Sequence, residues 1–226
     1  MPYKQSPQAF LKKDLIIIGA GNVGAFLAYN LDLFEGSYNL LGFLDDDGRK
    51  NGRQVAGYPV MGPVSAIYNY PAGTAVAVGI ASPLARKRIV DEIQSLPFEF
   101  PDFIARNAWL SKAVKTGRGV IIYPGVSINY ESELGNFVII NMNCAIGHNA
   151  QIADCCTLAP GVKFGGFTTL EECVEVGIGA ATRQNVHIGR NSIIGGQAMV
   201  LGKVPPHSTV KGVPGKISDN QRSFSD

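Results

Sequence analysis

The sequence predicts a small α/β domain followed by a long parallel β-coil. Two observations carry this prediction: a glycine-rich loop between an apolar strand and a helical run near the N-terminus, and a strict six-residue repeat through most of the remaining chain. A length of 226 residues leaves room for two modest domains. We expect the boundary between residues 103 and 104, with the α/β domain at 1–103 and the coil domain, including a C-terminal tail, at 104–226.

Large apolar residues recur at every sixth position between residues 104 and 200. The seventeen members of this series are Ile104, Leu110, Thr116, Ile122, Ile128, Leu134, Ile140, Ile146, Ile152, Leu158, Phe164, Leu170, Val176, Thr182, Ile188, Ile194 and Val200, and fifteen of them are Ile, Leu, Val or Phe. The residue four positions after each member is small or β-branched, from Ala108 to Val204. A period of six fits neither an α-helix nor a flat strand, whose periods are about 3.6 and 2. It fits a short strand followed by a turn, and three such units close a triangular coil of 18 residues.

Four cysteines are present, Cys144, Cys155, Cys156 and Cys173, and their spacing fits neither a zinc site nor a small disulfide framework. Cys144 and Cys156 fall on the small position of the repeat, which points into the coil. We therefore interpret these two residues as packing groups rather than catalytic ones. Unpaired thiols are typical of a reducing compartment, so the sequence predicts a cytoplasmic protein.

Composition excludes several classes of function. The chain is 46% hydrophobic and 17% charged, with a formal net charge of +2. It contains no apolar run of about 18 residues, the length that a membrane-spanning helix needs. Its start, MPYKQSPQAFLKKDL, lacks the apolar core of a signal peptide. Because the small charge is spread along the chain, we expect neither nucleic-acid binding nor membrane insertion.

The N-terminal third carries a candidate nucleotide site. An apolar strand at 15–18 is followed by G-x-G-x-x-G spacing at 19–24 and then by a helical run, and a second strand ends in three aspartates at 45–47. Glycines let the backbone approach a phosphate at a helix N-terminus, and an acidic residue that ends the second strand can accept hydrogen bonds from ribose hydroxyls. The candidate substrate-binding residues are Gly19, Gly21, Asp45 and Asp46. The alternative is a tight turn beside solvated aspartates.

Three further segments complete a small Rossmann-like α/β domain: a strand at 74–80, a helix at 83–93 and a strand at 98–104. A module of this size cannot hold both halves of NAD in the doubly wound manner. A nucleoside diphosphate linked to a sugar fits it better.

A small Rossmann-like domain followed by a hexapeptide coil resembles the nucleotide-aminosugar N-acetyltransferases of the bacillosamine and perosamine type. The motifs that carry the resemblance run along nearly the whole chain: IIIGAG, LGFLDD, INMNCAIGHNAQI, LAPGV, VEVGIGA, IIGGQAMV and VKGVPGK. The resemblance implies a left-handed parallel β-helix and a homotrimer. It also implies acetyl-CoA as co-substrate, a nucleotide-linked amino sugar as acceptor for surface glycan synthesis, and no bound metal.

The same resemblance implies roles for residues of the coil. His148 would be the general base that takes a proton as the sugar amine attacks the thioester. Asn149 stands where related enzymes often carry an acidic residue that orients this histidine, so the candidate catalytic pair is His148 and Asn149. Acetyl-CoA would lie between two subunits and contact the backbone at Gly166, Ile178 and Gly196.

The 18-residue spacing places these residues on two edges of the coil. Ile178 and Gly196 are 18 residues apart, so we expect them to stack on one edge. Gly166 follows His148 by the same interval and should stack on it, on a different edge. There it would leave space for the thioester and could offer its backbone N–H to a developing oxyanion. The alternative for Gly166 is a corner that needs a positive φ.

Three other functions stay open from the sequence alone. An O-acetyltransferase that acts on a sialic acid-type sugar would use the same architecture. A zinc carbonic anhydrase can use the same coil, but His148, His187 and His207, at spacings of 39 and 20 residues, fit three converging ligands poorly. A non-catalytic nucleotide-sugar-binding module is favoured by Asn149 and by Val23, which occupies a slot of the glycine loop where the family commonly has histidine.

Overall fold

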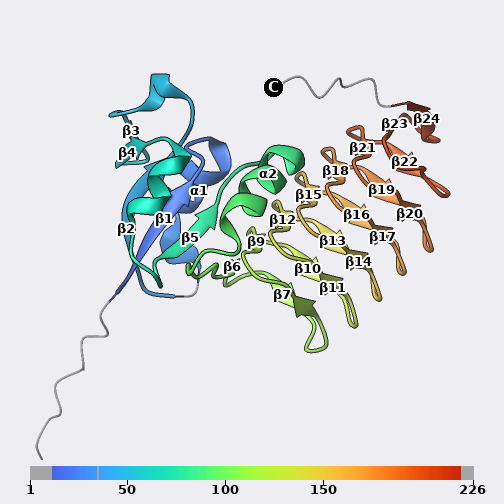
Figure 1. Ribbon diagram of the computed structural model, residues 1–226. Coiled ribbons are helices and arrows are strands. Elements are labelled where there is room, and N and C mark those ends of the chain that lie inside the picture. The colour runs from blue at the N-terminus through green and yellow to red at the C-terminus, as the bar shows by residue number, and fades with distance from the viewer. Residues whose placement is uncertain (1–11, 35, 220–226) are drawn as a thin grey trace, which may run out of the picture.

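The computed structural model describes residues 12–34 and 36–219, which form an α/β unit and a triangular β-coil packed against it (Figure 1). Most of the N-terminal segment in which we expect no signal peptide lies outside the described residues. Within the described residues, no helix is long and apolar enough to cross a bilayer.

The α/β unit is built on a five-stranded sheet in the order β3-β4-β2-β1-β5. Its elements are β1 (Lys13–Ile18), α1 (Asn22–Tyr29), β2 (Tyr38–Leu44), β3 (Gln54–Val55), β4 (Tyr58–Gly62), β5 (Ala75–Val78) and α2 (Pro83–Ile93), with short 3₁₀ segments η1 (Leu31–Leu33), η2 (Gly48–Lys50) and η3 (Val64–Asn69). Neighbouring strands run parallel except in the β3-β4 pair. The Rossmann-like α/β prediction is confirmed.

Both faces of this sheet are covered, which explains why β1 reads as a continuous apolar run. Leu15 and Ile17 belong to the hydrophobic cluster that contains the buried residues of α1. Ile16 and Ile18 belong to the cluster on the other face, with the buried Val and Ile residues of α2 and η3. Successive side chains of a strand point to opposite faces, so one short strand anchors a helix on each side.

The predicted strand at 98–104 is wrong in most of its length. Only Phe103–Ile104 form a strand, β6, and this strand begins the coil rather than ending the α/β sheet. Glu99 makes an isolated parallel bridge to Ala75. Pro101 lies between these two segments and has no N–H to donate to a sheet, which fits the interruption.

The coil consists of two-residue strands β6 to β22 in three parallel sheets, one for each side of the triangle. The first side contains β6 (Phe103–Ile104), β9 (Ile121–Ile122), β12 (Ile139–Ile140), β15 (Thr157–Leu158), β18 (Glu175–Val176) and β21 (Ile193–Ile194). The second side contains β7 (Trp109–Leu110), β10 (Ser127–Ile128), β13 (Ala145–Ile146), β16 (Lys163–Phe164), β19 (Ala181–Thr182) and β22 (Met199–Val200). The third side contains β8 (Lys115–Thr116), β11 (Glu133–Leu134), β14 (Gln151–Ile152), β17 (Thr169–Leu170) and β20 (His187–Ile188). The second residue of each strand is a member of the predicted six-residue series. The fold is the predicted left-handed parallel β-helix.

The end of the coil departs from this period. Strand β23 (Ser208–Lys211) pairs with β21 in parallel, and β24 (Lys216–Asp219) pairs with β23 antiparallel. Ile193 faces Thr209, a step of 16 residues instead of 18. The six-residue series is therefore specific to the body of the coil.

The corners of the coil have a left-handed backbone at every sixth residue. These positions are Gly119, Gly125, Glu131, Phe137, Asn143, Asn149, Cys155, Gly161, Phe167, Cys173, Gly179, Asn185, Asn191 and Gln197, all with φ between 53° and 74°. Outside glycine, asparagine tolerates this conformation best, and it occupies four of the corners. Each corner residue stacks on the one 18 residues away, so corner side chains form rows along the edges of the coil.

The α/β unit covers one side of the coil. Ile121, Tyr123 and Ile139 of the coil share a hydrophobic cluster with β1 and α1. Arg86 of α2 is fully buried at this junction and donates hydrogen bonds to the Cys155 carbonyl at 2.8 Å. It also donates to the Cys156 carbonyl, to the Thr157 hydroxyl and to two carbonyls that precede α2. One guanidinium thus joins the two parts of the chain.

All four cysteines are buried and form no disulfide. Cys144 and Cys156 lie within the core of the coil, so the prediction that they are packing residues is confirmed. Burial raises the pKa of the Cys144 thiol to about 11, and it raises the pKa of the Cys156 thiol further. Neither thiol is a reactive nucleophile in this state.

Candidate active site

His148 lies half-buried on the edge of the coil between β13 and β14. Its Nδ1 is 2.8 Å from Oδ1 of Asn149. An amide oxygen can only accept, so Nδ1 carries a ring hydrogen, and in the neutral imidazole the lone pair is then on Nε2. The Asn149 amide nitrogen donates in turn to Oε2 of Glu131, at 2.8 Å, from the corner one coil earlier. The three side chains form a continuous chain of hydrogen bonds.

Two aromatic rings flank the imidazole. Phe167 meets His148 edge-on, with ring centroids 5.0 Å apart, and Tyr130 lies at 6.4 Å in a tilted arrangement. Both aromatic residues remain about half exposed, 49% for Phe167 and 46% for Tyr130. They pack beside the imidazole and restrict its orientation.

Gly166 stacks on His148, as the 18-residue spacing predicts. A Cβ added at Gly166 would stand 2.6 Å from Nε2 and 2.7 Å from Cε1 of His148. The left-handed corner belongs to Phe167, whose φ is 58°, and Gly166 has no φ in that region. The reading of Gly166 as a corner that needs a positive φ is therefore wrong. Within the described residues, the Gly166 N–H has no hydrogen-bond partner, which leaves a free donor beside the imidazole.

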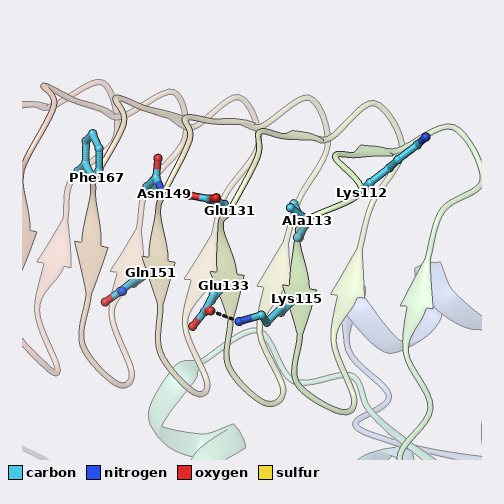
Figure 2. A pocket seen from close by; sticks show the side chains of 9 residues that line it. Lys112, Ala113, Lys115, Glu131, Glu133, Asn149, Gln151 and Phe167 are labelled. Carbon is cyan, nitrogen blue, oxygen red and sulfur yellow. Dashed lines mark hydrogen bonds and ion pairs between the residues drawn. The ribbon is translucent and has the colours of Figure 1, made fainter.

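Hollows lie on both sides of this edge. One, of about 660 Å³, is lined by Lys112, Ala113, Val114, Lys115, Glu131, Glu133, Asn149, Gln151 and Phe167 (Figure 2). Figure 2 shows Glu131 and Asn149 pointing toward one another, while Glu133 pairs with Lys115 at 2.7 Å. The other, of about 260 Å³, is lined by Trp109, Ser127, Asn129, Ala145, Ile146, Gly147 and Phe164. His148 is in neither lining, but its neighbours Gly147 and Asn149 each line one of the two hollows, so the edge that carries His148 lies between them.

The second predicted edge carries Ile178 and Gly196. The Gln197 N–H donates to the Ile178 carbonyl at 2.8 Å, and a Cβ on Gly196 would lie 3.3 Å from the same oxygen. These residues therefore stack as expected, and Ile178 is 60% exposed. Ile178 lies in the turn between β18 and β19, so the sheet that contains β13, β16 and β19 separates this edge from His148.

The four predicted residues of the α/β unit line one hollow of about 400 Å³. Its lining is Gly19, Gly21, Asn22, Val23, Asp45, Asp46, Lys50, Val64, Gly79, Ile80, Ala81, Ala85, Arg88 and Ile89. Gly19 has a φ of +98°, and an added Cβ would clash with Ile80, whereas a Cβ on Gly21 would meet nothing within 4 Å. The glycine loop therefore has no room for a side chain at Gly19, whereas the backbone at Gly21 has free space beside it.

Asp45 organises this hollow from the end of β2. Its carboxylate accepts hydrogen bonds from the Ala20 N–H at 2.7 Å, the Asp47 N–H at 2.9 Å and Lys50 Nζ at 2.8 Å. Burial acts to raise the pKa of Asp45, but the hydrogen bonds from Lys50 and the two backbone groups outweigh it and hold the pKa below its usual value. Asp46 accepts from the Val64 N–H at 2.8 Å. Both aspartates thus also hold loops in place.

Comparison with known proteins decides the family. Residues 14–93 match the PglD N-terminal domain family. The GDP-perosamine N-acetyltransferase of Escherichia coli O157:H7 is 30% identical over 174 residues, which cover 75% of this chain and 78% of that enzyme. The chain belongs to the perosamine- and bacillosamine-type N-acetyltransferases. It is thus a member of an enzyme family, as the sequence resemblance implied.

Two solved structures share the architecture over nearly all of the chain. PerB from Caulobacter crescentus, in complex with CoA and GDP-perosamine, superposes with a TM-score of 0.82 at 25% identity and covers 91% of this chain and 97% of that one. WeeI from Acinetobacter baumannii AYE gives a TM-score of 0.81 at 25% identity, over 92% of this chain and 100% of that one. The serine acetyltransferase of Synechococcus elongatus is 36% identical, but the match covers only 44% of this chain and 42% of that enzyme.

Sequence reasoning missed three residues of the edge that carries His148. Glu131 lies 18 residues before Asn149, and Phe167 lies 18 residues after it, so the repeat itself contains the signal that could have found both. Tyr130 stacks on the same edge 18 residues before His148. Elsewhere, His187 pairs with Glu171 at 2.9 Å, and no group of three or more potential metal ligands occurs within the described part of the chain.

Proposed function

We propose that this chain transfers the acetyl group of acetyl-CoA to the amino group of a nucleotide-linked amino sugar, with His148 as general base. The observation that carries the proposal is the set of contacts of the imidazole: Nδ1 is 2.8 Å from Asn149 Oδ1, and Nε2 lies beside Gly166 on an edge of the coil that has a hollow on each side. Membership of the N-acetyltransferase family supports the reaction class. The sugar in the Caulobacter complex, GDP-perosamine, supports the acceptor class.

The mechanism follows from the groups around Nε2. The sugar amine attacks the thioester carbonyl, and His148 Nε2 takes the proton that the nitrogen loses as the N–C bond forms. The negative charge that moves to the carbonyl oxygen is stabilised by the Gly166 N–H. Collapse of this intermediate breaks the C–S bond, and the CoA thiolate receives the proton from the imidazolium. The hydrogen bond from Nδ1 to Asn149 keeps the ring oriented throughout.

We propose that the two substrates bind to different parts of the chain. Residues 1–103 would hold the nucleotide through Gly19, Gly21, Asp45 and Asp46, and residues 104–226 would hold acetyl-CoA and the reacting groups. Acetyl-CoA would contact Gly166 on the edge of one subunit and Ile178 and Gly196 on the edge of a neighbour. A homotrimer would meet this requirement, because one chain keeps the two edges on opposite sides of a sheet.

We also propose that the enzyme works in the cytoplasm, in a pathway for surface glycans. Four free thiols support a reducing compartment.

A thiol-release assay tests the proposed function. Acetyl-CoA is supplied with GDP- and UDP-linked amino sugars, and with the same sugars carrying hydroxyl in place of the amine. We expect thiol release with at least one amino sugar and a product whose acetyl group resists hydroxylamine, as an amide does and an ester does not. A hydroxylamine-sensitive product would indicate O-acetylation. Absence of thiol release with every sugar, despite binding of acetyl-CoA, would contradict the proposal.

A further inference from the structure

We propose that Glu131 is a positioning residue, which fixes the orientation of the Asn149 amide and thereby decides which nitrogen of His148 is the base. This inference rests on the proposed function. Asn149 Nδ2 donates to Glu131 Oε2 at 2.8 Å, and Asn149 Oδ1 is 2.8 Å from His148 Nδ1. Figure 2 shows the Glu131 and Asn149 side chains meeting along the edge of the coil.

The argument depends on what each group can donate. An ionised carboxylate only accepts hydrogen bonds, so Glu131 must face the NH₂ end of the Asn149 amide. The amide oxygen then faces His148, where it can only accept, and Nδ1 must carry the hydrogen. The lone pair is left on Nε2, the nitrogen that faces Gly166. Without Glu131, Asn149 could present either end to the ring, and the NH₂ end would stabilise the tautomer with no lone pair on Nε2.

The backbone conformation of Glu131 also supports the positioning role. Glu131 has a φ of 53° and is the one acidic residue among the described left-handed corners of the coil. Non-glycine residues in this conformation are uncommon, and asparagine is favoured over glutamate. Backbone conformation therefore does not explain a glutamate at this corner. Its side chain, however, reaches Asn149 at the corner of the next coil. The 18-residue stacking places these two corners one above the other, within reach of a side-chain hydrogen bond.

Glu133 provides a matched control. It lies two residues further along the same coil and lines the same hollow. Its carboxylate pairs with Lys115 at 2.7 Å and takes no part in the chain of hydrogen bonds to His148. Glu133→Gln therefore removes an equal charge from the same neighbourhood without touching the Asn149 amide.

The test compares Glu131→Gln, Asn149→Asp, the double variant and Glu133→Gln. For Glu131→Gln we expect kcat to fall about tenfold, because a share of the molecules adopts the tautomer that cannot act as base. We expect KM for acetyl-CoA to stay unchanged. In protein with ¹⁵N-labelled histidine, the ring nitrogens of His148 should shift toward the form with hydrogen on Nε2; the chain has only 3 histidines, so assignment is direct. Glu133→Gln should change neither quantity.

Asn149→Asp provides a background in which Glu131 is not needed to orient the side chain at position 149. An aspartate at this position accepts from Nδ1 whatever Glu131 does, so the tautomer no longer depends on Glu131. In this background Glu131→Gln should leave kcat unchanged or raise it, because the substitution also removes a like charge from beside the new carboxylate. The effect of Glu131→Gln on kcat thus disappears or changes sign between the two backgrounds, which a purely structural role would not produce.

Two outcomes would overturn the positioning role. One is a His148 ring spectrum and a kcat that Glu131→Gln leaves unchanged in the original background. The other is an equal loss of kcat in both backgrounds with unaltered ring nitrogens. If the original chain transfers no acetyl group, the proposed function fails, but the ring nitrogens still report whether Glu131 sets the tautomer.

Discussion

Gly166 and His148 are in contact across one coil: a Cβ added to Gly166 would stand 2.6 Å from Nε2 of the imidazole. Real side chains do not approach this closely, so the ring occupies space that only glycine leaves free. The left-handed φ belongs to the next residue, Phe167. The glycine is thus explained by clearance for the imidazole and not by backbone conformation.

Gly166→Ala should therefore impair catalysis more than folding. The methyl group would push the imidazole away from its position, and we expect kcat to fall at least about tenfold, since small displacements of a catalytic group can cost about 10²-fold. Because Gly166 needs no positive φ, the melting temperature should change by only a few degrees. Steady-state kinetics and thermal unfolding measure both quantities.

Gly202→Ala serves as the control for this substitution. A Cβ at Gly202 would meet nothing within 4 Å, and its φ is not left-handed. Normal kcat in Gly166→Ala, or a loss of activity explained entirely by unfolding, would remove the clearance argument.

His148→Ala should lower kcat by about 10²-fold or more, the usual scale for removal of a general base. The residue lies half-buried on an edge rather than in the core of the coil, so the fold and the oligomeric state should persist. His187→Ala is the matched control, because His187 lies in β20, away from the edge of His148, and pairs with Glu171. Turnover near that of the unaltered enzyme in His148→Ala would exclude His148 as the base.

Asp45→Asn should weaken the nucleotide-sugar site and leave acetyl-CoA affinity unchanged, because the proposed sites lie in different parts of the chain. Loss of a charge-assisted hydrogen bond should cost about 1.5–3 kcal/mol of sugar-nucleotide binding. Calorimetry with each ligand measures this. Asp47→Asn is the control, since Asp47 pairs with Arg49 and is not among the residues that line the hollow. Unchanged sugar-nucleotide affinity in Asp45→Asn would favour the tight turn with solvated aspartates.

The same carboxylate predicts a dependence of stability on pH. The pKa of Asp45 is lower in the folded protein than its usual value, so the folded state favours the ionised form. The stabilisation is present above the unfolded-state pKa of about 3.9 and is lost as the pH falls through the lower folded-state pKa. The unfolding free energies of the unaltered protein and Asp45→Asn should therefore differ at neutral pH and converge in acid. A constant difference across this range would contradict the linkage.

Arg86→Met should destabilise the junction between the α/β unit and the coil. The substitution removes the donor of the buried Cys155 carbonyl, whereas the Cys156 carbonyl keeps the Ile139 N–H. Loss of one buried polar partner costs about 3 kcal/mol. Denaturant unfolding should show this loss. Lys87→Met is the control, because the neighbouring Lys87 pairs with Asp91 at the surface. Equal stability of the two variants would show that apolar packing alone holds the junction.

The body of the coil could be predicted residue by residue from the sequence. Every member of the six-residue series from Ile104 to Val200 is the second residue of a strand. The strand prediction is correct because each strand repeats one local geometry. The register, the inward-facing positions and the 18-residue stacking therefore all follow from a single period. The same period predicts that Gly166 stacks on His148 and Gly196 on Ile178, and both pairs do so in the structure.

The sequence was less informative where the chain is not periodic. The pairing of β3 with β4 and the interruption between Glu99 and Phe103 are absent from the sequence prediction. These short segments carry no hydrophobic pattern long enough to distinguish a strand from a loop.

The sequence by itself determined the order of the parts along the chain: a glycine loop on an α/β sheet, then a coil of period six with a histidine on one of its edges. Only the tertiary structure decided which polar groups meet. Arg86 reaches carbonyls about 70 positions away, at Cys155 and Cys156, and Glu131 completes the chain of hydrogen bonds to His148 through Asn149. A repeat fixes where backbones stack, but side-chain direction and donor–acceptor matching depend on the packed neighbours, and these exist only once the coil has closed.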